Sequence, residues 1–314
     1  MALMLNYTLK QLRYVEAAGR LGSISNAAIE LAISQSSITA AIDTLEDGLG
    51  YDLFIRTPAK GIRTTPQGAE ALTLIRRFMH QARHFEAEMQ SVSGATRGAL
   101  RIACYATAAP AFLPIILRSV TETFPEISIT VLEGSLNQIV DYLNEGEADL
   151  AFSYEQFSDP RHRFEPLFDA PPYAIVPRDD PIAGAGITTL AELAKRPLVL
   201  LDLPGAREYY MRLFETAGLT LNVAHSTRSS EILRALVAGG FGASFLNIRP
   251  LDYRADESGY RIVPIIDGGK PPTFGIVTIS ASNPPRFVRA FIQNCIELKE
   301  KKAFTNLVVK VSTK

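Results

Sequence analysis

The sequence of 314 residues predicts a multi-domain protein with an all-α N-terminal part and a two-lobed α/β C-terminal part. Three observations lead to this fold class. Residues 8–50 carry the start and stop signals of three short helices. A basic hairpin and one long helix follow within residues 53–92. From Leu100 onward, short apolar runs alternate with helical segments, which is typical of α/β units with parallel strands.

The three short helices are predicted from their capping residues. Thr8 and Gln11 have the spacing of a capping box for the first helix. A serine at 23 or 25 begins the second, which ends near residue 31, and Ser34 begins the third, which ends at about residues 45–47 before two glycines. The residues expected to face the core are Leu9, Leu12, Val15 and Ala18 in the first helix and Ile38, Ile42, Leu45 and Leu49 in the third.

The other face of the third helix is small and polar, and it includes Ala40 and Asp43. Such a face, at the front of a helix that follows a tight turn, suits insertion into the major groove of DNA. There glutamine can bond adenine, and serine or threonine can bond several base edges. The residues of this helix predicted to contact DNA are Gln35, Ser36, Ser37 and Thr39.

Residues 53–64 are predicted to form a two-stranded hairpin with a turn at residues 57–61. The hairpin carries Arg56, Lys60 and Arg63 with no acidic residue between them, as phosphate contacts or minor-groove insertion require. The alternative is a solvated charged hairpin. The neighbouring helix-turn-helix pattern favours DNA contact.

A long helix is predicted from Pro66 to about residue 92. Its apolar residues recur at three- and four-residue spacing, as in a coiled-coil seam whose partner is the same helix of a second subunit. The alternative is a surface helix packed on its own chain. The seam residues are Leu72, Ile75, Met79, Ala82 and Met89.

The C-terminal part is predicted to contain two sets of strands and helices, separated at Pro171-Pro172. The first set has strands at 100–104, 127–132 and 150–153 and helices at 111–124 and 136–145. The second has strands at 173–176, 198–201, 221–224 and 243–246 and helices at 207–217 and 231–238. Strands at 262–265 and 274–279 return, and a helix at 285–299 closes the fold. Residues 304–314 remain unassigned.

These residues resemble the LysR-type transcriptional regulators. The resemblance lies in Ala27-Ala28, Ser34-Gln35-Ser36, Leu45-Glu46, Leu49-Gly50, Leu53-Phe54, Arg56 and Thr65-Pro66-x-Gly68, and again in Leu233-x-x-Leu236-Val237-Ala238-Gly239-Gly240-Phe241-Gly242. It implies a winged helix-turn-helix (1–65), a linker and dimerisation helix (66–93) and an effector-binding domain (94–303). That domain is similar to periplasmic solute-binding proteins, with one lobe at about 99–170 and 272–303 and the other at about 171–271.

Two positions of the third helix depart from the family pattern. The family commonly has proline after the Ser-Gln pair and a Ser-Arg pair one turn later. This chain has Ser36 at the first place and Thr39-Ala40-Ala41 at the second. The missing arginine removes a strong backbone or guanine contact, so operator binding is expected to depend more on the hairpin.

The resemblance also places effector-binding residues in loops beyond the carboxyl ends of strands, where helix N-termini favour anions. The residues carried over by position are Tyr105, Thr107, Ser135, Tyr154, Arg207 and Asn247. Hydroxyls would bond a small anionic effector, and Arg207 would neutralise its carboxylate. Plainer roles stay open: Thr107 and Ser135 as helix caps, Arg207 as an exposed residue at a helix start, and Tyr154 as a packed aromatic.

Several classes of protein are disfavoured by the composition. A net charge of −1 argues against a chain that coats nucleic acid non-specifically. No N-terminal apolar stretch or spanning run occurs, so a cytoplasmic location is expected. Cys104 and Cys295 do not form a disulfide framework, and Cys104 is expected to be a buried hydrophobe. His80 and His84 have no third ligand in the sequence, so no metal is expected. No nucleophile elbow, phosphate loop or zinc motif occurs, so no cofactor or catalytic residue is expected.

The sequence therefore predicts a homo-oligomeric regulator that binds double-stranded operator DNA. Its operator binding is expected to change when a small molecule closes the lobes. The resemblance leaves contact with RNA polymerase open. Two other classes are weighed. A solute receptor without DNA function explains only the C-terminal part. An enzyme on the same lobes would need a clustered acid and base in the cleft, and the cleft loops offer chiefly hydroxyls.

Overall fold

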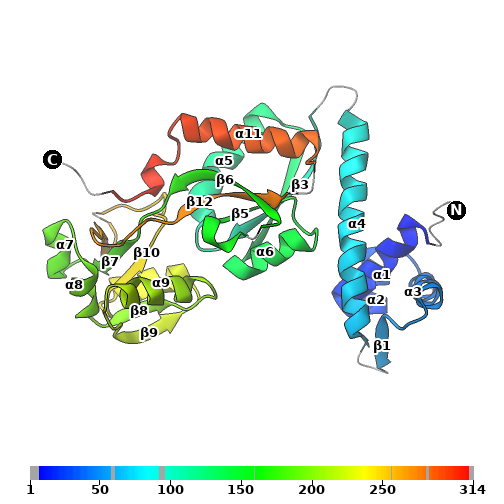
Figure 1. Cartoon of the computed structure of the whole chain (residues 1–314), viewed down its shortest axis with the longest axis horizontal. Helices are drawn as coiled ribbons and strands as arrows, with labels where there is room; N and C mark the ends of the chain where they lie inside the picture. Colours follow the sequence, from blue (N-terminus) through cyan, green and yellow to red (C-terminus); the bar gives the residue numbers. More distant parts are fainter. Residues whose placement is uncertain are drawn as a thin grey trace. The chain divides into compact units, whose positions relative to one another are not determined.

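The computed structural model describes residues 7–57, 61–91, 96–158, 160–255, 257–280 and 283–310. The chain divides into two compact units (Figure 1). The first, the N-terminal unit, comprises residues 1–92 together with residues 144–147. The second, the C-terminal unit, comprises residues 93–143 and 148–314. No helix among the described residues is long and apolar enough to cross a membrane.

The N-terminal unit has three short helices, a hairpin and one long helix. Its elements are α1 (Leu9–Leu21), α2 (Ile24–Glu30), α3 (Gln35–Leu49), β1 (Phe54–Thr57), β2 (Gly61–Thr64) and α4 (Pro66–Ser91). The capping predictions are confirmed, because Thr8, Ser23 and Ser34 are the N-caps of α1, α2 and α3. Helix α3 runs through Gly48 and ends at Gly50, whose left-handed backbone suits glycine.

The core of this unit is formed by the predicted faces of α1 and α3. Leu12, Val15 and Ala18 are buried, as are Ile38, Ile42 and Leu45 of α3. The prediction was wrong for Leu9, which is 50% exposed at the first position of α1.

Two close backbone approaches fix the hairpin and the long helix on this core. The N–H of Ile62 donates to the carbonyl of Gly22 at 3.0 Å, and a side chain at Gly61 would meet that carbonyl. A Cβ at Gly68 would lie 2.0 Å from the carbonyl oxygen of Leu53. Glycine at 68 therefore lets the first turn of α4 pack directly against the hairpin.

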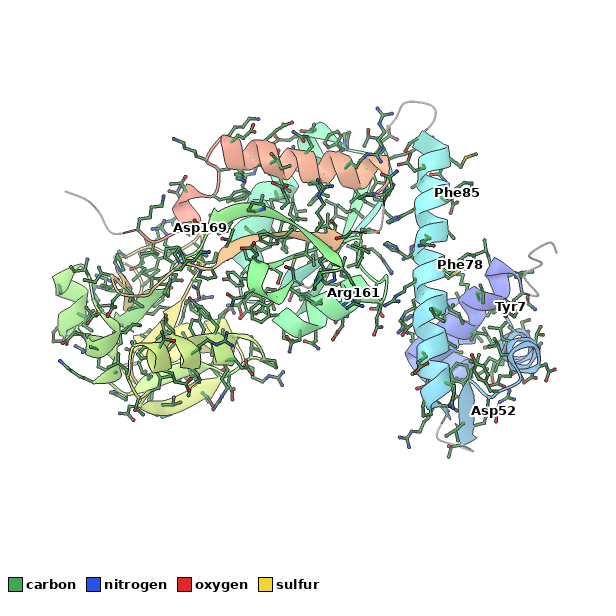
Figure 2. The ribbon with its side chains drawn as sticks, in the orientation of Figure 1. Tyr7, Asp52, Phe78, Phe85, Arg161 and Asp169 are labelled. Atoms are coloured by element: carbon green, nitrogen blue, oxygen red, sulfur yellow. The ribbon has the colours of Figure 1, made fainter. Side chains whose placement is uncertain are left out.

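The predicted seam of α4 is wrong over its first half. Leu72 and Ile75 are buried in the core of their own chain, and Met79 packs against that core. The alternative expectation, a helix packed on its own chain, holds for these turns. A different apolar stripe is exposed on α4, and Figure 2 shows its two phenylalanines on one side of the helix. The stripe consists of Leu74, Phe78, Phe85 and Met89.

The C-terminal unit contains two lobes, defined by their sheets. Lobe I has a five-stranded sheet in the order β4-β3-β5-β12-β6, and lobe II has sheets β10-β7-β11 and β8-β9. The strands are β3 (Gly98–Tyr105), β4 (Ile127–Gly134), β5 (Leu150–Tyr154), β6 (His162–Asp169), β7 (Tyr173–Pro177), β8 (Leu198–Leu201), β9 (Val223–Thr227), β10 (Ser244–Leu246), β11 (Tyr260–Pro264) and β12 (Thr273–Ile279). The helices are α5 (Ala109–Thr123), α6 (Leu136–Asn144), α7 (Pro181–Ala185), α8 (Leu190–Ala194), α9 (Ala206–Thr216), α10 (Ser230–Ala238) and α11 (Arg286–Glu300), with 3₁₀ turns at Glu155–Phe157 and Thr305–Leu307.

The sheets are mixed, which corrects the expectation of parallel strands. Strands β3, β4 and β5 are parallel, but β12 runs antiparallel to β5 and β6, and β7 runs antiparallel to β10 and β11. The edge strand β6 and the short helices α7 and α8 were not predicted. Strand β6 contains Pro166 and has no regular alternation of burial, and an edge strand tolerates both features.

The previously unassigned C-terminal segment packs on the unit. Phe304 and Leu307 are buried, and the ring of Phe304 lies 5.4 Å from that of Phe168 on β6. The N–H of Arg249, after β10, donates to the carbonyl of Leu307 at 2.9 Å. The segment therefore contacts both lobes where the chain crosses between them.

Candidate DNA-binding surface and effector cleft

The start of α3 presents a polar surface held by its N-cap. The hydroxyl of Ser34 accepts the N–H of Ser37 at 3.2 Å and lies 2.8 Å from the hydroxyls of both Ser36 and Ser37. Gln35 is exposed and makes no side-chain hydrogen bond within the described part of the chain, whereas Thr39 is half-buried. Gln35 is therefore the residue of this face that is freest to bond a base.

Arg56 has two carboxylate neighbours on α3 that the sequence analysis did not anticipate. Its guanidinium donates to Asp43 and lies 3.5 Å from Oε2 of Glu46. The hydrogen bond to Asp43 raises the pKa of Arg56 further above its ordinary value. Because Arg56 and Asp43 are both well exposed, this pair contributes only about 0–1 kcal/mol to stability. Its consequence is local: the arginine neutralises a carboxylate on the face predicted to meet DNA.

Glu46 has a structural role at the start of the hairpin. Its Oε1 accepts the N–H of Leu53 at 2.7 Å and that of Phe54 at 3.1 Å. The carboxylate thus fixes the hairpin at a set position beside α3. Arg63, opposite Ile55 on the other strand, is exposed and makes no ion pair among the described residues. Lys60 lies outside the residues that the structure describes.

In the C-terminal unit, the structure brings together Tyr105, Tyr154 and Asn247 of the predicted effector residues. They enclose a cavity of about 20 Å³ between the lobes, which has room for about one water molecule. Sequence reasoning missed the remaining walls, which are Leu136, Gln156, Phe157, Ala206, Tyr209, Tyr210 and Pro272. The sequence did offer one signal for these residues. Two adjacent tyrosines, Tyr209 and Tyr210, follow the Pro204-Gly205 pair within a predicted helix.

Asn247 makes three hydrogen bonds at the centre of the cleft. Its Nδ2 donates to the carbonyl of Ala170 at 2.8 Å and to the hydroxyl of Tyr209 at 3.3 Å. Its Oδ1 accepts the hydroxyl of Tyr210 at 2.8 Å. Burial raises the pKa of Tyr105 to about 12 and that of Tyr210 well above its ordinary value. The cleft is therefore lined by neutral hydroxyls near neutral pH.

The other three predicted effector residues do not line this cavity. Thr107 bonds Tyr105, and Ser135 caps α6 by accepting the N–H of Gln138 at 3.4 Å. Arg207 is exposed and pairs with Asp202 at 2.9 Å. The structure thus does not bring Arg207 to the cleft. It is an exposed residue at the start of α9, which is the alternative role that the sequence left open.

Both cysteines are buried, and burial raises the pKa of each thiol. Buried thiols of raised pKa are poor nucleophiles.

Two family models match the chain. A model described as "Bacterial regulatory helix-turn-helix protein, lysR family" matches residues 9–69, and one described as "LysR substrate binding domain" matches residues 93–299. The chain belongs to the LysR family. It is thus a transcriptional regulator with a DNA-binding domain and an effector-binding domain, and the family acts as oligomers and is not enzymatic.

Individual relatives agree with this assignment. The chain is 29% identical over 257 residues to the HTH-type transcriptional regulator cbl of Escherichia coli (strain K12), covering 81% of each chain. It is 31% identical to the solved structure of HinK, a LysR family regulator from Pseudomonas aeruginosa, with a TM-score of 0.60 and coverage of 94% of this chain and 99% of that one. Full-length CbnR complexed with its target DNA shares the fold at 21% identity, with a TM-score of 0.67 and coverage of 93% and 99%.

The pairing of Arg56 with Asp43 leads to a prediction about operator binding. Arg56→Gln should weaken binding by up to about fivefold across sequences, because it leaves the Asp43 carboxylate unneutralised near the phosphates. Adding Asp43→Asn should restore at least half of the lost binding free energy. Fluorescence anisotropy with operator DNA at fixed salt measures both. A double variant that binds as weakly as the single one would mean that Arg56 acts only through its phosphate contact and that its neutralisation of Asp43 has no effect on binding.

Proposed function

We propose that this LysR-family regulator reads its operator mainly through Gln35 and holds the DNA backbone through the hairpin. The observation that carries this proposal is the exposed amide of Gln35, which has no hydrogen-bond partner among the described residues and lies at the front of a capped helix that follows a tight turn. A glutamine amide can make two bonds to adenine in the major groove. Ser36, Ser37 and Thr39 would add contacts around it, and Arg56, Lys60 and Arg63 would contact phosphates.

The exposed stripe of α4 supports a dimer through this helix. Leu74, Phe78, Phe85 and Met89 project over four turns with no cover among the described residues, and exposed apolar stripes of this size mark protein contacts. We assign residues 1–65 to the DNA-binding domain, 66–93 to the linker helix and 94–303 to the effector domain. The two recognition helices of such a dimer would meet an inverted repeat.

We further propose that a small anionic effector binds between the lobes. The first residues of two helices, Leu136 of α6 and Ala206 of α9, line the cleft beside the tyrosine hydroxyls and Asn247. Helix N-termini and hydroxyl donors together favour an anion, so this preference does not depend on Arg207. A cavity of about 20 Å³ admits no such molecule, so the lobes must open to admit it.

The effector then acts by shifting a population. An effector that contacts both lobes binds the open and closed arrangements unequally, and this difference sets how far operator binding can change. Contact with RNA polymerase and action in the cytoplasm, where operator DNA lies, belong to the same proposal. A solute receptor without DNA function is disfavoured by the helix-turn-helix match over residues 9–69.

Selection of bound sequences from a random DNA pool tests the DNA proposal. The wild-type chain should enrich an inverted repeat. Gln35→Ala should reduce the preference for one base at one operator position by about 1–3 kcal/mol. Arg63→Ala should instead weaken binding to all sequences and lower the slope of log affinity against log salt concentration by about one. If both variants change only thermal unfolding, these residues do not contact DNA.

The dimer proposal is tested by adding charge to the stripe. Phe85→Glu should raise the dimer dissociation constant by at least about thirtyfold, since large apolar anchors in interfaces commonly contribute about 2 kcal/mol or more. Sedimentation equilibrium measures it. The matched control is Ala69→Glu, an exposed position on the opposite face of α4, which should leave the dimer intact. Equal effects of the two variants would contradict this interface.

The effector proposal is tested with a panel of small carboxylates and operator DNA. At least one should change the operator affinity by about fivefold or more. Asn247→Leu should abolish that response, because it removes the hydrogen bonds at the centre of the cleft. The same substitution at the exposed Asn222 is the control and should keep the response. A response that survives Asn247→Leu would place the effector elsewhere.

A further inference from the structure

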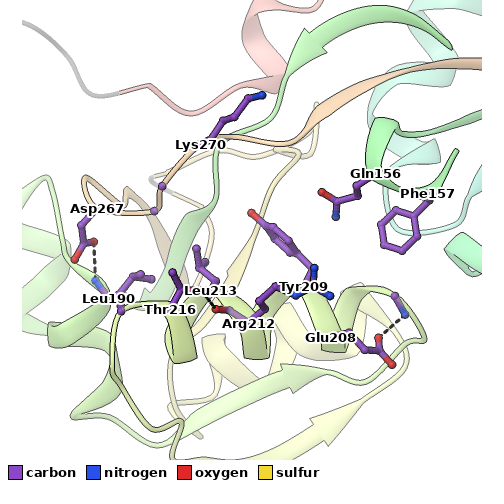
Figure 3. A pocket seen from close by; sticks show the side chains of 14 residues that line it. Gln156, Phe157, Leu190, Glu208, Tyr209, Arg212, Leu213, Thr216, Asp267 and Lys270 are labelled. Carbon is purple, nitrogen blue, oxygen red and sulfur yellow. Dashed lines mark hydrogen bonds between the residues drawn. The ribbon is translucent and has the colours of Figure 1, made fainter.

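A second, larger pocket lies beside the cleft, with a volume of about 500 Å³ (Figure 3). One wall is α9, and the opposite wall is the 3₁₀ turn after β5, which carries Gln156 and Phe157. Residues 267–270, where the chain returns from β11 to β12, and Leu190 of α8 complete it. Both lobes therefore contribute to the pocket, and its volume is within the range of about 300–1,000 Å³ that is typical of ligand sites.

The four charged side chains of this pocket differ in whether they have hydrogen-bond partners. Oε2 of Glu208 accepts the N–H of Gly205 at 2.5 Å, and Oδ1 of Asp267 accepts the N–H of Leu190 at 2.8 Å, as the dashed lines in Figure 3 mark. Arg212 and Lys270 have no side-chain partner among the described residues. The two carboxylates are thus turned to backbone donors, while the two cations remain available to an incoming anion.

The rest of the lining is largely apolar. The apolar residues are Phe157 on one wall, Leu213 of α9 and Ala217 directly after α9 on the other, and Leu190. A ligand that uses both features must carry an anionic group and an apolar body. We propose that this pocket binds a second small molecule, an amphipathic carboxylate whose anion pairs with Arg212, with Lys270 adding positive charge at the rim. This goes beyond the proposed effector site in the cleft.

Tyr209 connects the pocket to the cleft. Its side chain lines both cavities, and its hydroxyl accepts the hydrogen bond from Asn247. Gln156 and Phe157 also line both. A molecule in the pocket therefore contacts side chains that form the cleft. Because the pocket walls come from both lobes, its occupant would favour the closed arrangement.

A single tryptophan provides a direct binding signal, because the chain has none. Thr216→Trp places it at an exposed position on the pocket wall of the full-length protein. The probes are 4-phenylbutyrate and the uncharged 4-phenylbutanol. The carboxylate should give a saturable fluorescence change at millimolar or lower concentration, and the alcohol should bind at least about fivefold more weakly.

Charge variants in the Thr216→Trp background locate the site. Arg212→Gln and Lys270→Gln should each weaken the carboxylate by about threefold or more, because each removes one of the two cations. Arg207→Gln, on the same helix but outside the pocket, should leave it unchanged. Equal binding of acid and alcohol, equal effects of the three variants, or no saturable signal would each overturn the proposal.

This experiment is independent of the proposed function. Probe binding is read without DNA, so a pocket that binds the carboxylate would stand even if no molecule changed operator binding. Conversely, loss of the pocket signal would leave the cleft proposal untouched.

Discussion

The amide of Asn247 is the point on which the arrangement of the two lobes depends. It joins the carbonyl of Ala170, at the crossing between the lobes, to the hydroxyls of Tyr209 and Tyr210 on α9. A buried amide without partners would cost about 1–3 kcal/mol, so any opening of the lobes must replace these bonds with water or ligand. An anionic molecule with acceptor oxygens can do so from one side. The side chain that joins Ala170 to α9 in this structure is thus also the one that an effector is proposed to engage.

The N-terminal unit depends on a comparable constraint, the packing of α4 on its own core. Leu72 and Ile75 complete the apolar interior that α1 and α3 cannot close alone. The glycine at 68 then brings the helix against the backbone of Leu53, so hairpin, recognition helix and α4 form one body. Rotation of α4 would therefore carry with it the surface that is proposed to contact DNA. Among the described residues of α4, the side that carries Phe78 and Phe85 is exposed and apolar, and it is the side proposed to meet a second subunit.

The sequence predicted features that are set by residues three or four apart. The caps at Thr8, Ser23 and Ser34 were found because their hydrogen bonds reach only to the next turn. Contacts across longer separations were missed. The partners of Arg56 lie 10 and 13 residues away on α3, and the periodicity of α4 could not tell a core stripe from a subunit stripe. Arg207 was assigned to the cleft by its position in the family resemblance, but its side chain pairs with Asp202 instead.

Helix α9 explains why the candidate site was only half predicted. Its first residue and Tyr210 face the cleft, whereas Arg212 and Leu213 face the larger pocket, and Tyr209 lies between and lines both. The spacing of apolar residues predicts one buried face for a helix. Helix α9 lies between two cavities, so two of its faces line candidate sites. Movement of α9 toward lobe I would tighten both cavities at once. Two ligands of similar charge could therefore reinforce each other without touching, because each would stabilise the same position of one helix.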